Sequence, residues 1–488
     1  MNTLRDILYG VRLLDVVGPT DIEVTGLSLD SRTVADGHVF FAVPGTRVDG
    51  HDFIDAAIEA GARAVVCERV PDEPDDGVTW VRTDHTARAM GQMASAVHDH
   101  PTRQLKVVGV TGTNGKTTVA TGLYRLFRAL GHASGLISTV ENIIDGRVVP
   151  TRHTTPDALT LQALLADMVD AGCEFVFMEV SSHALHQERV AGIEFAGAVF
   201  TNLSHDHLDY HGTFAAYRDA KKMLFDGLSS DAFALVNIDD RNGRFMLQNC
   251  DGHHHSFAVH GDADVRVRIL ENDVNGLMLL VDDVEVHTRM VGAFNASNLA
   301  AMYGAARLLG ADKAEVLRAL SDLRPADGRF QVVRAEGESP TGIVDYAHTP
   351  DALENVLDTL RTVRSPGQRV VTVIGCGGDR DATKRPVMAR VAVRLSDQVV
   401  LTSDNPRTEL PEAILDDMET GLAADDKRRV LRVTDRREAI RTAVRLAAAN
   451  DIILVAGKGH ETYQEIDGVR HDFDDRAELL TALQETAR

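Results

Sequence analysis

The feature that most constrains the fold of this chain is a glycine-rich turn between an apolar run and a helical pattern. The apolar run at 105–110 predicts a buried strand, and the pattern at 117–130 predicts a helix. Between them, Gly112 and Gly115 predict a tight turn. A strand, a glycine turn and a helix in this order aim backbone N–H groups and a helix N-terminus at a phosphate. The turn therefore predicts an anion-binding loop.

The residues that follow the turn indicate a nucleoside triphosphate as the bound anion. We expect Lys116 to reach the β- and γ-phosphates, and the hydroxyl of Thr117 to bind Mg²⁺. The strict phosphate-loop pattern has a glycine five residues before Gly115, where this chain has Val110. The match is therefore a variant with a tighter loop, and an ordinary glycine turn before a helix is the alternative.

Length and charge bound the organisation of the chain and its partners. At 488 residues it is too long for a single hydrophobic core. We predict a small N-terminal α/β domain at 1–103, a central phosphate-loop α/β domain at 104–328 and a C-terminal Rossmann-like α/β domain at 329–488. With 51 basic and 73 acidic residues, the formal charge of −22 argues against partners such as nucleic acid and anionic membranes.

The cysteines and the apolar runs indicate the cellular compartment of the protein. The four cysteines lie far apart without a Cys-x-x-Cys pair, which favours buried thiols (Cys67, Cys173, Cys250 and Cys376). The histidine tract at 253–255 is expected to be an exposed loop rather than a metal site. No early stretch resembles a signal peptide, and no apolar run approaches the length of a membrane span. We therefore expect a cytoplasmic protein.

Two further apolar runs in the central domain end in polar side chains. The run at 175–180 predicts a buried strand that carries Glu179, a carboxylate that is rarely left unpaired in such a place. The run at 197–201 is followed closely by His205, Asp206 and His207. Side chains at the carboxyl ends of neighbouring strands face the crevice in which open sheets bind ligands. The cluster predicts a Mg²⁺ site, with a zinc site or a purely structural role as alternatives.

The C-terminal part alternates predicted strands with predicted helices. Strands are expected at 342–346, 369–374, 398–402, 430–433 and 451–455. This is the pattern of a doubly wound α/β domain of Rossmann type. The glycine-rich turn that follows the second of these strands is similar to a dinucleotide-binding turn. No acidic residue stands where NAD binding requires one, which argues against that cofactor.

Polar residues follow four of these strands. They lie in the segments 345–348, 379–381, 404–407 and 458–461. The carboxyl ends of parallel strands meet at one edge of a sheet, which is where such sheets bind ligands. Four polar segments at one edge therefore predict a binding site, which we expect to face the nucleotide crevice.

Several candidate residues also have structural interpretations that the sequence leaves open. Thr155 and Asn295 could each cap a helix. Ser31 follows a short predicted strand, where turn chemistry is an equally good explanation. Lys221 and Lys222 could lie on the solvated face of a predicted helix.

Taken together, these motifs resemble those of the ATP-dependent Mur ligases, which build the peptide stem of peptidoglycan. The resemblance covers essentially the whole chain and is carried by residues 111–118, 178–183, 200–211, 220–221, 295–298, 327–330 and 345–350. The segment Asp404-Asn405-Pro406-Arg407 resembles the signature of the members that add diaminopimelate, in place of lysine, as the third residue of the stem.

The resemblance implies roles for the residues around the phosphate loop. It implies ATP contacts at Gly112, Thr113, Asn114, Gly115, Lys116, Thr117, Thr118, Asn295, Arg329 and Asp345. It implies Mg²⁺ ligands at Thr117, Glu179, His207 and Lys221, with Lys221 as N6-carboxylysine. The residues that it implies for catalysis are Lys116, Glu179, His207 and Lys221.

The resemblance also implies two sets of substrate contacts. The set for UDP-MurNAc-L-Ala-D-Glu is Ser31, Thr154, Thr155, Ser181, Gln187 and Arg189. The set for diaminopimelate is Arg385, Asp404, Asn405, Arg407, Gly457 and Glu461. In the second set, arginine can grip a carboxylate and the acidic residues suit an ammonium group.

The reaction that the resemblance implies is an acyl activation. The γ-phosphoryl group of ATP passes to the D-glutamate carboxylate, and the amine of meso-diaminopimelate then displaces phosphate. The expected partners are these small molecules, and the protein is expected to be a monomer. Three domains that carry three ligands predict closure, with hinges near residues 103 and 328.

Other functions compete with this hypothesis. The same scaffold could add LL-diaminopimelate or L-lysine, although lysine would leave the arginine of the pocket without a carboxylate. A folate polyglutamate ligase is disfavoured because Ser31 and the segment 49–53 look like nucleotide-substrate features. A non-catalytic, nucleotide-dependent switch is the alternative from a different class.

Overall fold

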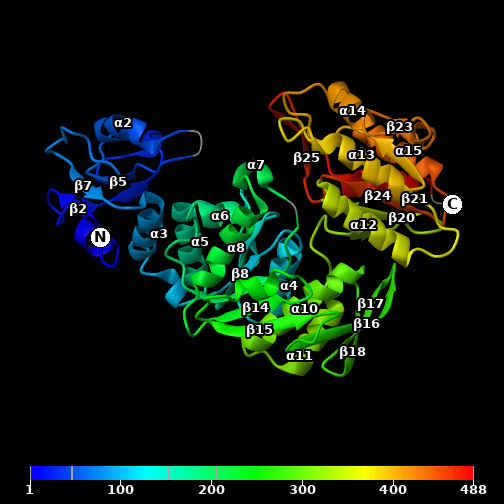
Figure 1. The fold of residues 1–488 in the computed structure, drawn as a ribbon, viewed down its shortest axis with the longest axis horizontal. Coiled ribbons are helices and arrows are strands. Elements are labelled where there is room, and N and C mark those ends of the chain that lie inside the picture. Colours follow the sequence, from blue (N-terminus) through cyan, green and yellow to red (C-terminus); the bar gives the residue numbers. More distant parts are fainter. Residues whose placement is uncertain (1, 46–47, 152, 205, 487–488) are drawn as a thin grey trace. The chain divides into compact units, whose positions relative to one another are not determined.

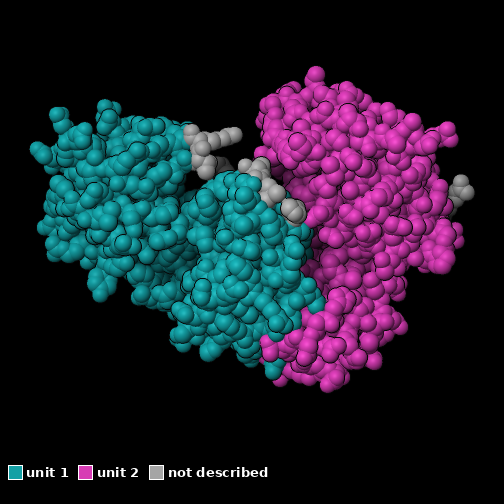
Figure 2. All heavy atoms as spheres, viewed as in Figure 1, with its two compact units in different colours: residues 1–256, 304–310 teal, residues 257–303, 311–488 magenta. Residues whose placement is uncertain are grey.

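The computed structural model describes residues 2–45, 48–151, 153–204 and 206–486. The chain divides into two compact units, one formed by residues 1–256 with 304–310 and the other by residues 257–303 with 311–488 (Figures 1 and 2). The predicted domain boundaries at 103 and 328 stay predictions.

The first unit begins with a small α/β sheet of mostly parallel strands. Its strand order is β2 (Asp15–Val17), β7 (Thr79–Arg82), β6 (Ala64–Cys67), β5 (His38–Phe41) and β4 (Gly26–Ser28). Only β2 runs antiparallel to its neighbour. Two short strands, β1 (Asn2–Thr3) and β3 (Glu23–Val24), form a separate antiparallel pair, and helix α1 (Leu4–Ile7) directly follows β1 in the chain. Apolar side chains pack on both faces of the sheet, together with α2 (Ile54–Glu59) and α3 (Thr86–Val97).

The second sheet of the first unit confirms the predicted strand, turn and helix. Seven of its strands follow the order β11 (Arg147–Val149), β10 (Asn142–Ile144), β9 (Ser134–Ile137), β12 (Phe175–Glu179), β8 (Lys106–Thr111), β13 (Phe195–Phe200) and β14 (Phe233–Asn237). The five strands β9, β12, β8, β13 and β14, neighbours in this order, are parallel. Its helices are α4 (Lys116–Ala129), α5 (Ala158–Asp170), α6 (Ser182–His186), α7 (Leu208–His211), α8 (Phe214–Asp226) and α9 (Gly243–Met246).

The register of this sheet sets the site. Strand β8 pairs in parallel with β12, so that Val110 lies opposite Glu179. It pairs with β13 on its other side, so that Thr111 lies opposite Phe200. The residues that follow β8, β12 and β13 therefore emerge side by side at one edge, as parallel strands require.

One loop prediction was wrong. The histidine tract at 253–255 opens strand β15 (His253–Ala258). The side chains of His253 and His254 are exposed, while Phe257 and Ala258 are buried. A strand whose first half faces water has polar residues there, and such residues also occur in loops.

The second unit starts with an antiparallel meander. Strands β16 (Val265–Asp273), β17 (Gly276–Val281) and β18 (Val284–Thr288) pair in sequence. Helix α10 (Ala293–Leu308) begins in this unit, and α11 (Lys313–Asp322) follows it.

The C-terminal sheet confirms the predicted doubly wound pattern. Its strand order is β19 (Gln331–Val333), β20 (Thr341–Asp345), β24 (Ile452–Ala456), β21 (Val370–Ile374), β22 (Gln398–Leu401) and β23 (Val430–Arg432). All but the edge strand β19 are parallel. The helices are α12 (Pro350–Val363), α13 (Lys384–Leu395), α14 (Pro411–Glu419), α15 (Arg436–Leu446) and α16 (Asp475–Thr486). The hairpin of β25 (Tyr463–Ile466) and β26 (Val469–Asp472) precedes α16.

Alternation along the strands of this sheet explains its two cores. In β21, Val370 and Ile374 pack with α12, α13 and α14, whereas Val371 and Val373 pack with α15 and α16. Successive side chains of a strand point to opposite faces, and a parallel sheet covered on both faces is apolar throughout. Because these strands are parallel, the polar segments that follow them lie at one edge of the sheet, its carboxyl edge.

Candidate functional site

The phosphate loop has two glycines in backbone conformations that favour glycine. Gly112 has a φ of 149°, and a Cβ atom added to it would lie 2.0 Å from the Oγ1 atom of Thr201. Gly115 has a φ of 88° and precedes the first residue of α4. Side chains are strained at such φ values, so both positions favour glycine. The tight-loop prediction is confirmed at these two glycines.

Residues after β13 hold the loop in place, which the sequence had not indicated. Asn202 accepts a hydrogen bond at Oδ1 from the backbone N–H of Asn114 (2.9 Å) and donates from Nδ2 to its carbonyl (3.0 Å). The hydroxyl of Thr201 donates to the same carbonyl at 2.6 Å. An asparagine two residues past a strand looks like an ordinary turn residue, so only the strand pairing shows what it contacts.

Two lysines converge on the loop. The Nζ atom of Lys116 donates to the carbonyl oxygens of Gly112 (3.0 Å) and Thr113 (2.9 Å). The Nζ atom of Lys221, from α8, donates to the same Gly112 oxygen at 2.8 Å. These contacts bring together two of the residues predicted for catalysis.

The environment of Lys221 excludes the solvated helix face. The residue is 1% exposed, and its Nζ atom lies 4.6 Å from the ring centroid of Tyr217. Burial lowers the pKa of Lys221 well below its usual value, and the charge of Lys116 lowers it further, against the opposing effect of Asp206. Lys222 is also buried, but it pairs with Asp226 and the carbonyl of Gln248 instead.

Glu179 links the phosphate loop to the next loop of the same sheet. It is 1% exposed; its Oε2 atom accepts a hydrogen bond from Thr117 Oγ1 (3.0 Å), and its Oε1 atom accepts one from the backbone of Thr139 (2.7 Å). Thr139 Oγ1 donates to Thr154 Oγ1 at 3.0 Å. Each oxygen of the buried carboxyl group thus accepts a hydrogen bond, as burial of a polar group requires.

Four residues predicted for the UDP-linked substrate form one network. Arg189 donates to the carbonyl of Thr155 (3.0 Å) and to Oε1 of Gln187 (2.6 Å). The backbone N–H of Ser181 donates to Thr155 Oγ1 at 3.3 Å, while the Ser181 hydroxyl caps α6. Burial lowers the pKa of Arg189. Tyr210, which the sequence did not single out, accepts from Gln187 Nε2 at 2.9 Å.

Ser31 lies outside this network, in the turn that follows strand β4 of the first sheet. It starts a short 3₁₀ helix, Ser31–Thr33, whose N-cap residue is Asp30. Arg32 forms an exposed ion pair with Asp30 at 2.6 Å. The local turn chemistry that the sequence left open is therefore present at this position.

His207 lies in a cluster of rings. Its φ is 53°, its Nε2 atom is 3.5 Å from Asp206, and its ring centroid is 4.8 Å from that of His183. His205 lies outside the described residues. Within the described ranges, no three His, Cys, Asp or Glu side chains group as metal ligands.

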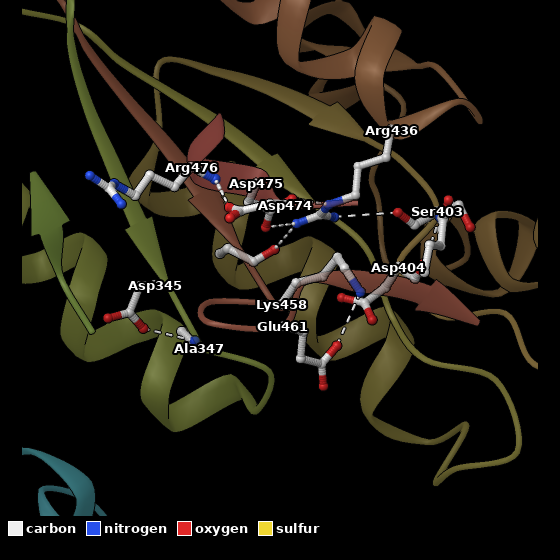
Figure 3. Close-up of polar contacts among 12 residues, drawn as sticks. Asp345, Ala347, Ser403, Asp404, Arg436, Lys458, Glu461, Asp474, Asp475 and Arg476 are labelled. Carbon is white, nitrogen blue, oxygen red and sulfur yellow. Dashed lines mark hydrogen bonds and ion pairs between the residues drawn. The ribbon is translucent and has the colours of Figure 1, made fainter. Parts of the chain in front are cut away.

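Of the predicted ATP contacts of the second unit, Asn295 and Asp345 are buried and Arg329 is half-buried. Asp345 accepts hydrogen bonds from the backbone of Phe330 (2.7 Å) and Ala347 (2.8 Å), and the Ala347 contact is drawn in Figure 3. Burial raises the pKa of Asp345, against the opposing charge of Arg329. The guanidinium carbon of Arg329 lies 4.6 Å from the ring centroid of Tyr346. The side chain of Asn295 donates a hydrogen bond from Nδ2 to the carbonyl oxygen of Val291 (2.8 Å), just before its own helix begins.

The predicted diaminopimelate residues after β22 and β24 meet at the carboxyl edge of their sheet (Figure 3). Asn405 Nδ2 donates to Glu461 Oε2 at 2.7 Å. Gly457 has a φ of 118°, and a Cβ atom there would lie 2.5 Å from Asp404 Oδ2. Glycine is thus needed both for its conformation and for the close approach of Asp404.

The two arginines predicted to contact diaminopimelate differ in their hydrogen-bond partners. Arg407 has a φ of 51° and donates from Nη1 to the carbonyl of Gly378 at 2.8 Å. Arg385 is 2% exposed and donates to Asp417 and Glu409, each at 2.8 Å. These ion pairs raise the pKa of Arg385. Its guanidinium already pairs with protein carboxylates, which a sequence cannot show.

Two buried cations to which the sequence analysis gave no individual role lie beside this set. Lys458 is 0% exposed, and Arg436 is 1% exposed. Arg436 binds both oxygens of Asp475 at 2.7 Å and donates to the carbonyls of Ser403 (3.3 Å) and Ala456 (3.0 Å) (Figure 3). The available signal was weak: Lys458 belongs to a polar segment after a strand, and Arg436 starts a helix.

The chain matches three family models over most of its length. Their descriptions are "Mur ligase family, catalytic domain" (residues 23–98), "Mur ligase middle domain" (110–306) and "Mur ligase, glutamate ligase domain" (328–459). Across the described ranges, no helix is long and apolar enough to cross a membrane.

Relatives match nearly the full chain. UDP-N-acetylmuramoyl-L-alanyl-D-glutamate–2,6-diaminopimelate ligase of Cytophaga hutchinsonii is 53% identical over 484 residues, which are 98% of this chain and 99% of that protein. The ligase of the same name from Phocaeicola vulgatus is 51% identical over 476 residues, 98% of each chain. A solved structure of a ligase with this name is 35% identical, with a TM-score of 0.70 over 99% of both chains.

Proposed function

The chain belongs to the Mur ligase family, and on that premise we propose that it is an ATP-dependent ligase that adds meso-2,6-diaminopimelate to UDP-MurNAc-L-Ala-D-Glu. The product is the tripeptide precursor of peptidoglycan. Relatives that are named as diaminopimelate ligases and match 98% of the chain support the substrate pair.

The observation that carries the choice of amino acid is the cluster after β22 and β24. It places the carboxylates of Asp404 and Glu461 and the amide of Asn405 at the carboxyl edge of the sheet. Arg407 follows Asp404 by three residues. Carboxylates suit the ammonium group of a diamino acid, and an arginine suits its distal carboxylate. L-Lysine has no distal carboxylate, and it would leave the arginine unpaired.

The phosphate loop supports the use of ATP. The γ-phosphoryl group passes to the D-glutamate carboxylate, which gives an acyl phosphate and ADP. The amine of diaminopimelate then attacks the acyl carbon, loses a proton and expels phosphate. Lys116 stabilises negative charge on the transferred group, and the loop N–H groups orient it.

The residues around the loop fit a divalent cation. The Thr117 hydroxyl, the Glu179 carboxylate, His207 and a carbamylated Lys221 would hold Mg²⁺, which supplies charge neutralisation to phosphoryl transfer when bound. Carbamylation needs a neutral amine, and the lowered pKa of buried Lys221 favours that form. Carbon dioxide would then supply a carboxylate that the sequence does not encode.

The remaining assignments follow from the same premise. Thr154, Thr155, Ser181, Gln187 and Arg189 hold the dipeptide-linked substrate, and Ser31 contacts its uridine part. Asn295, Arg329 and Asp345 contact ATP. We also assign Arg385 to the diaminopimelate set; in this structure its guanidinium pairs with Glu409 and Asp417. We place the reaction in the cytoplasm, where a monomer acts on small molecules.

The test is phosphate release with ATP, Mg²⁺ and UDP-MurNAc-L-Ala-D-Glu against a panel of amino acids. The panel is meso-diaminopimelate, LL-diaminopimelate, L-lysine and L-ornithine. We expect release with meso-diaminopimelate and little with lysine or ornithine. A preference for the LL isomer would change only the stereochemistry of the substrate, and a preference for lysine would overturn the pocket. Release without any amino acid would indicate an uncoupled nucleotidase.

A further inference from the structure

We propose that Lys458 is a positioning residue for the amino-acid substrate, acting by holding Asn405 and Glu461 in one hydrogen-bonded arrangement. The inference rests on the proposed function, because it takes Asn405 and Glu461 to contact the incoming diamino acid. It gives an individual role to Lys458, which the sequence analysis placed only within the polar segment 458–461.

The contacts of Lys458 are directed at both residues. Its Nζ atom donates to Asn405 Oδ1 at 2.9 Å and to Glu461 Oε2 at 3.0 Å. The side chain is 0% exposed, whereas that of Glu461 is 17% exposed. Lys458 therefore lies behind Glu461, on the side away from solvent, and Figure 3 shows its ammonium group directed at the Glu461 carboxylate.

These contacts determine how the amide of Asn405 is turned. Oδ1 accepts from Lys458 Nζ and from the backbone N–H of Glu465, each at 2.9 Å. Nδ2 donates to Glu461 Oε2 at 2.7 Å. A flipped amide would set its NH₂ group against two donors and its oxygen against a carboxylate, so one orientation is selected.

The same contacts determine which oxygen of Glu461 meets the substrate. Oε2 accepts from both Asn405 and Lys458. Among the residues that the structure describes, Oε1 has no hydrogen-bond partner. A carboxylate fixed through one oxygen presents the other in a set direction, which suits recognition of an ammonium group.

Charge supports the same role. The cluster contains two carboxylates, Asp404 and Glu461, close to a buried strand edge. The ammonium of Lys458 offsets one of these two negative charges and leaves the other to face the ammonium group of the substrate.

The backbone brings Lys458 to this position. It lies between Gly457, with a φ of 118°, and Gly459, with a φ of 56°. A Cβ atom on Gly459 would lie 2.7 Å from the Cβ atom of Tyr346, so the turn packs tightly there. Its ammonium is also 5.4 Å from the ring centroid of Tyr463. The lysine side chain is therefore enclosed and its reach is defined.

The experiment is steady-state kinetics of the full chain with each substrate varied in turn. Wild type comes first: without turnover of any diaminopimelate, the proposed function itself fails. With turnover established, Lys458→Met keeps the length of the side chain and removes the ammonium. We expect the KM for diaminopimelate to rise about 10- to 100-fold, since hydrogen bonds to charged groups are lost. The KM values for ATP and UDP-MurNAc-L-Ala-D-Glu should stay within about twofold.

The control is Arg369→Met, which removes a cation at the opposite end of the same sheet. Arg369 pairs with the buried carboxylate of Asp451, 2.7 Å away, just before β24 begins. This variant should lose thermal stability without a change in the KM for diaminopimelate. If a general loss of stability in the domain were the cause, the KM for diaminopimelate would rise in both variants.

A double-mutant cycle separates positioning from packing. In a Glu461→Gln background the partner charge is gone, so Lys458→Met should raise the KM for diaminopimelate by less than about threefold. If Lys458→Met does not fold, Lys458→Gln takes its place in the cycle. An unchanged KM for diaminopimelate, an equal rise in all three KM values, or the full effect in the Glu461→Gln background would each overturn the proposal.

Discussion

The ammonium nitrogen of Lys221 lies 2.8 Å from the carbonyl oxygen of Gly112, although the two residues are 109 positions apart in the chain. The contact brings a fully buried lysine from α8 to the base of the phosphate loop. Burial and the neighbouring charge of Lys116 lower the pKa of this lysine, which favours a neutral and reactive amine.

The first prediction concerns carbamylation of Lys221. Lys221→Ala should lower ligase activity by about 100-fold or more, since a metal ligand is lost. Short carboxylic acids such as acetate should restore part of the activity by replacing the carbamate, measured as phosphate release against acid concentration. Lys222→Ala is the matched control, because that lysine pairs with Asp226 and Gln248. Loss of activity in Lys222→Ala with a normal Lys221→Ala would reverse the assignment.

The second prediction concerns the phosphate loop. Gly112→Ala should raise the KM for ATP more than about tenfold and cost about 1–3 kcal/mol of stability, because its Cβ atom would meet Thr201 Oγ1 at 2.0 Å. Gly131→Ala is the control: its φ is 90°, but no atom of the described residues beyond its own neighbours comes within 4 Å of the added Cβ. Titration with an ATP analogue and thermal unfolding of both variants check the effect. Equal ATP affinity in the two variants would contradict it.

The third prediction concerns the distal carboxylate of the amino acid. Arg407→Ala should raise the KM for diaminopimelate about 10- to 100-fold by removing a charge-assisted pair. It should also reduce the preference for diaminopimelate over L-lysine, since lysine never used that arginine. Arg428→Ala, whose side chain is 84% exposed, is the control and should leave both quantities unchanged. Unaltered selectivity in Arg407→Ala would place the carboxylate elsewhere.

The fourth prediction concerns pH. Burial lowers the pKa of His460 to about 4, and the charges of Arg329 and Lys458 act in the same direction. The folded state therefore keeps the imidazole neutral while the unfolded chain takes up a proton below about 6.5. The stability that this contributes is present above pH 6.5 and is lost as the pH falls towards 4, by about 1–3 kcal/mol.

Urea unfolding at pH 7 and at pH 4.5 tests this prediction. The wild type should lose more stability between the two pH values than His460→Gln, in which the titrating group is gone. The exposed His471, in β26, provides the control variant His471→Gln, which should behave as the wild type does. The same loss in all three proteins would show that His460 does not contribute.

Local patterns in the sequence were enough for much of the fold. The apolar run before Gly112 and the strands of the C-terminal sheet were predicted correctly, because buried parallel strands are continuous apolar runs that polar residues end. Glu179 and Asp404 could be placed at strand ends for the same reason. Residues 253–255 were misjudged because a half-exposed strand is as polar as a loop.

The sequence by itself determined the order of the elements, the phosphate loop and which polar residues follow which strands, since these depend on neighbours along the chain. Only the tertiary structure decided which side chains meet. It buried Lys221 at Gly112, brought Lys458 to Asn405, and paired Arg385 with Glu409 and Asp417. Such contacts join segments far apart in sequence, and packing and desolvation select them, so no local pattern records them.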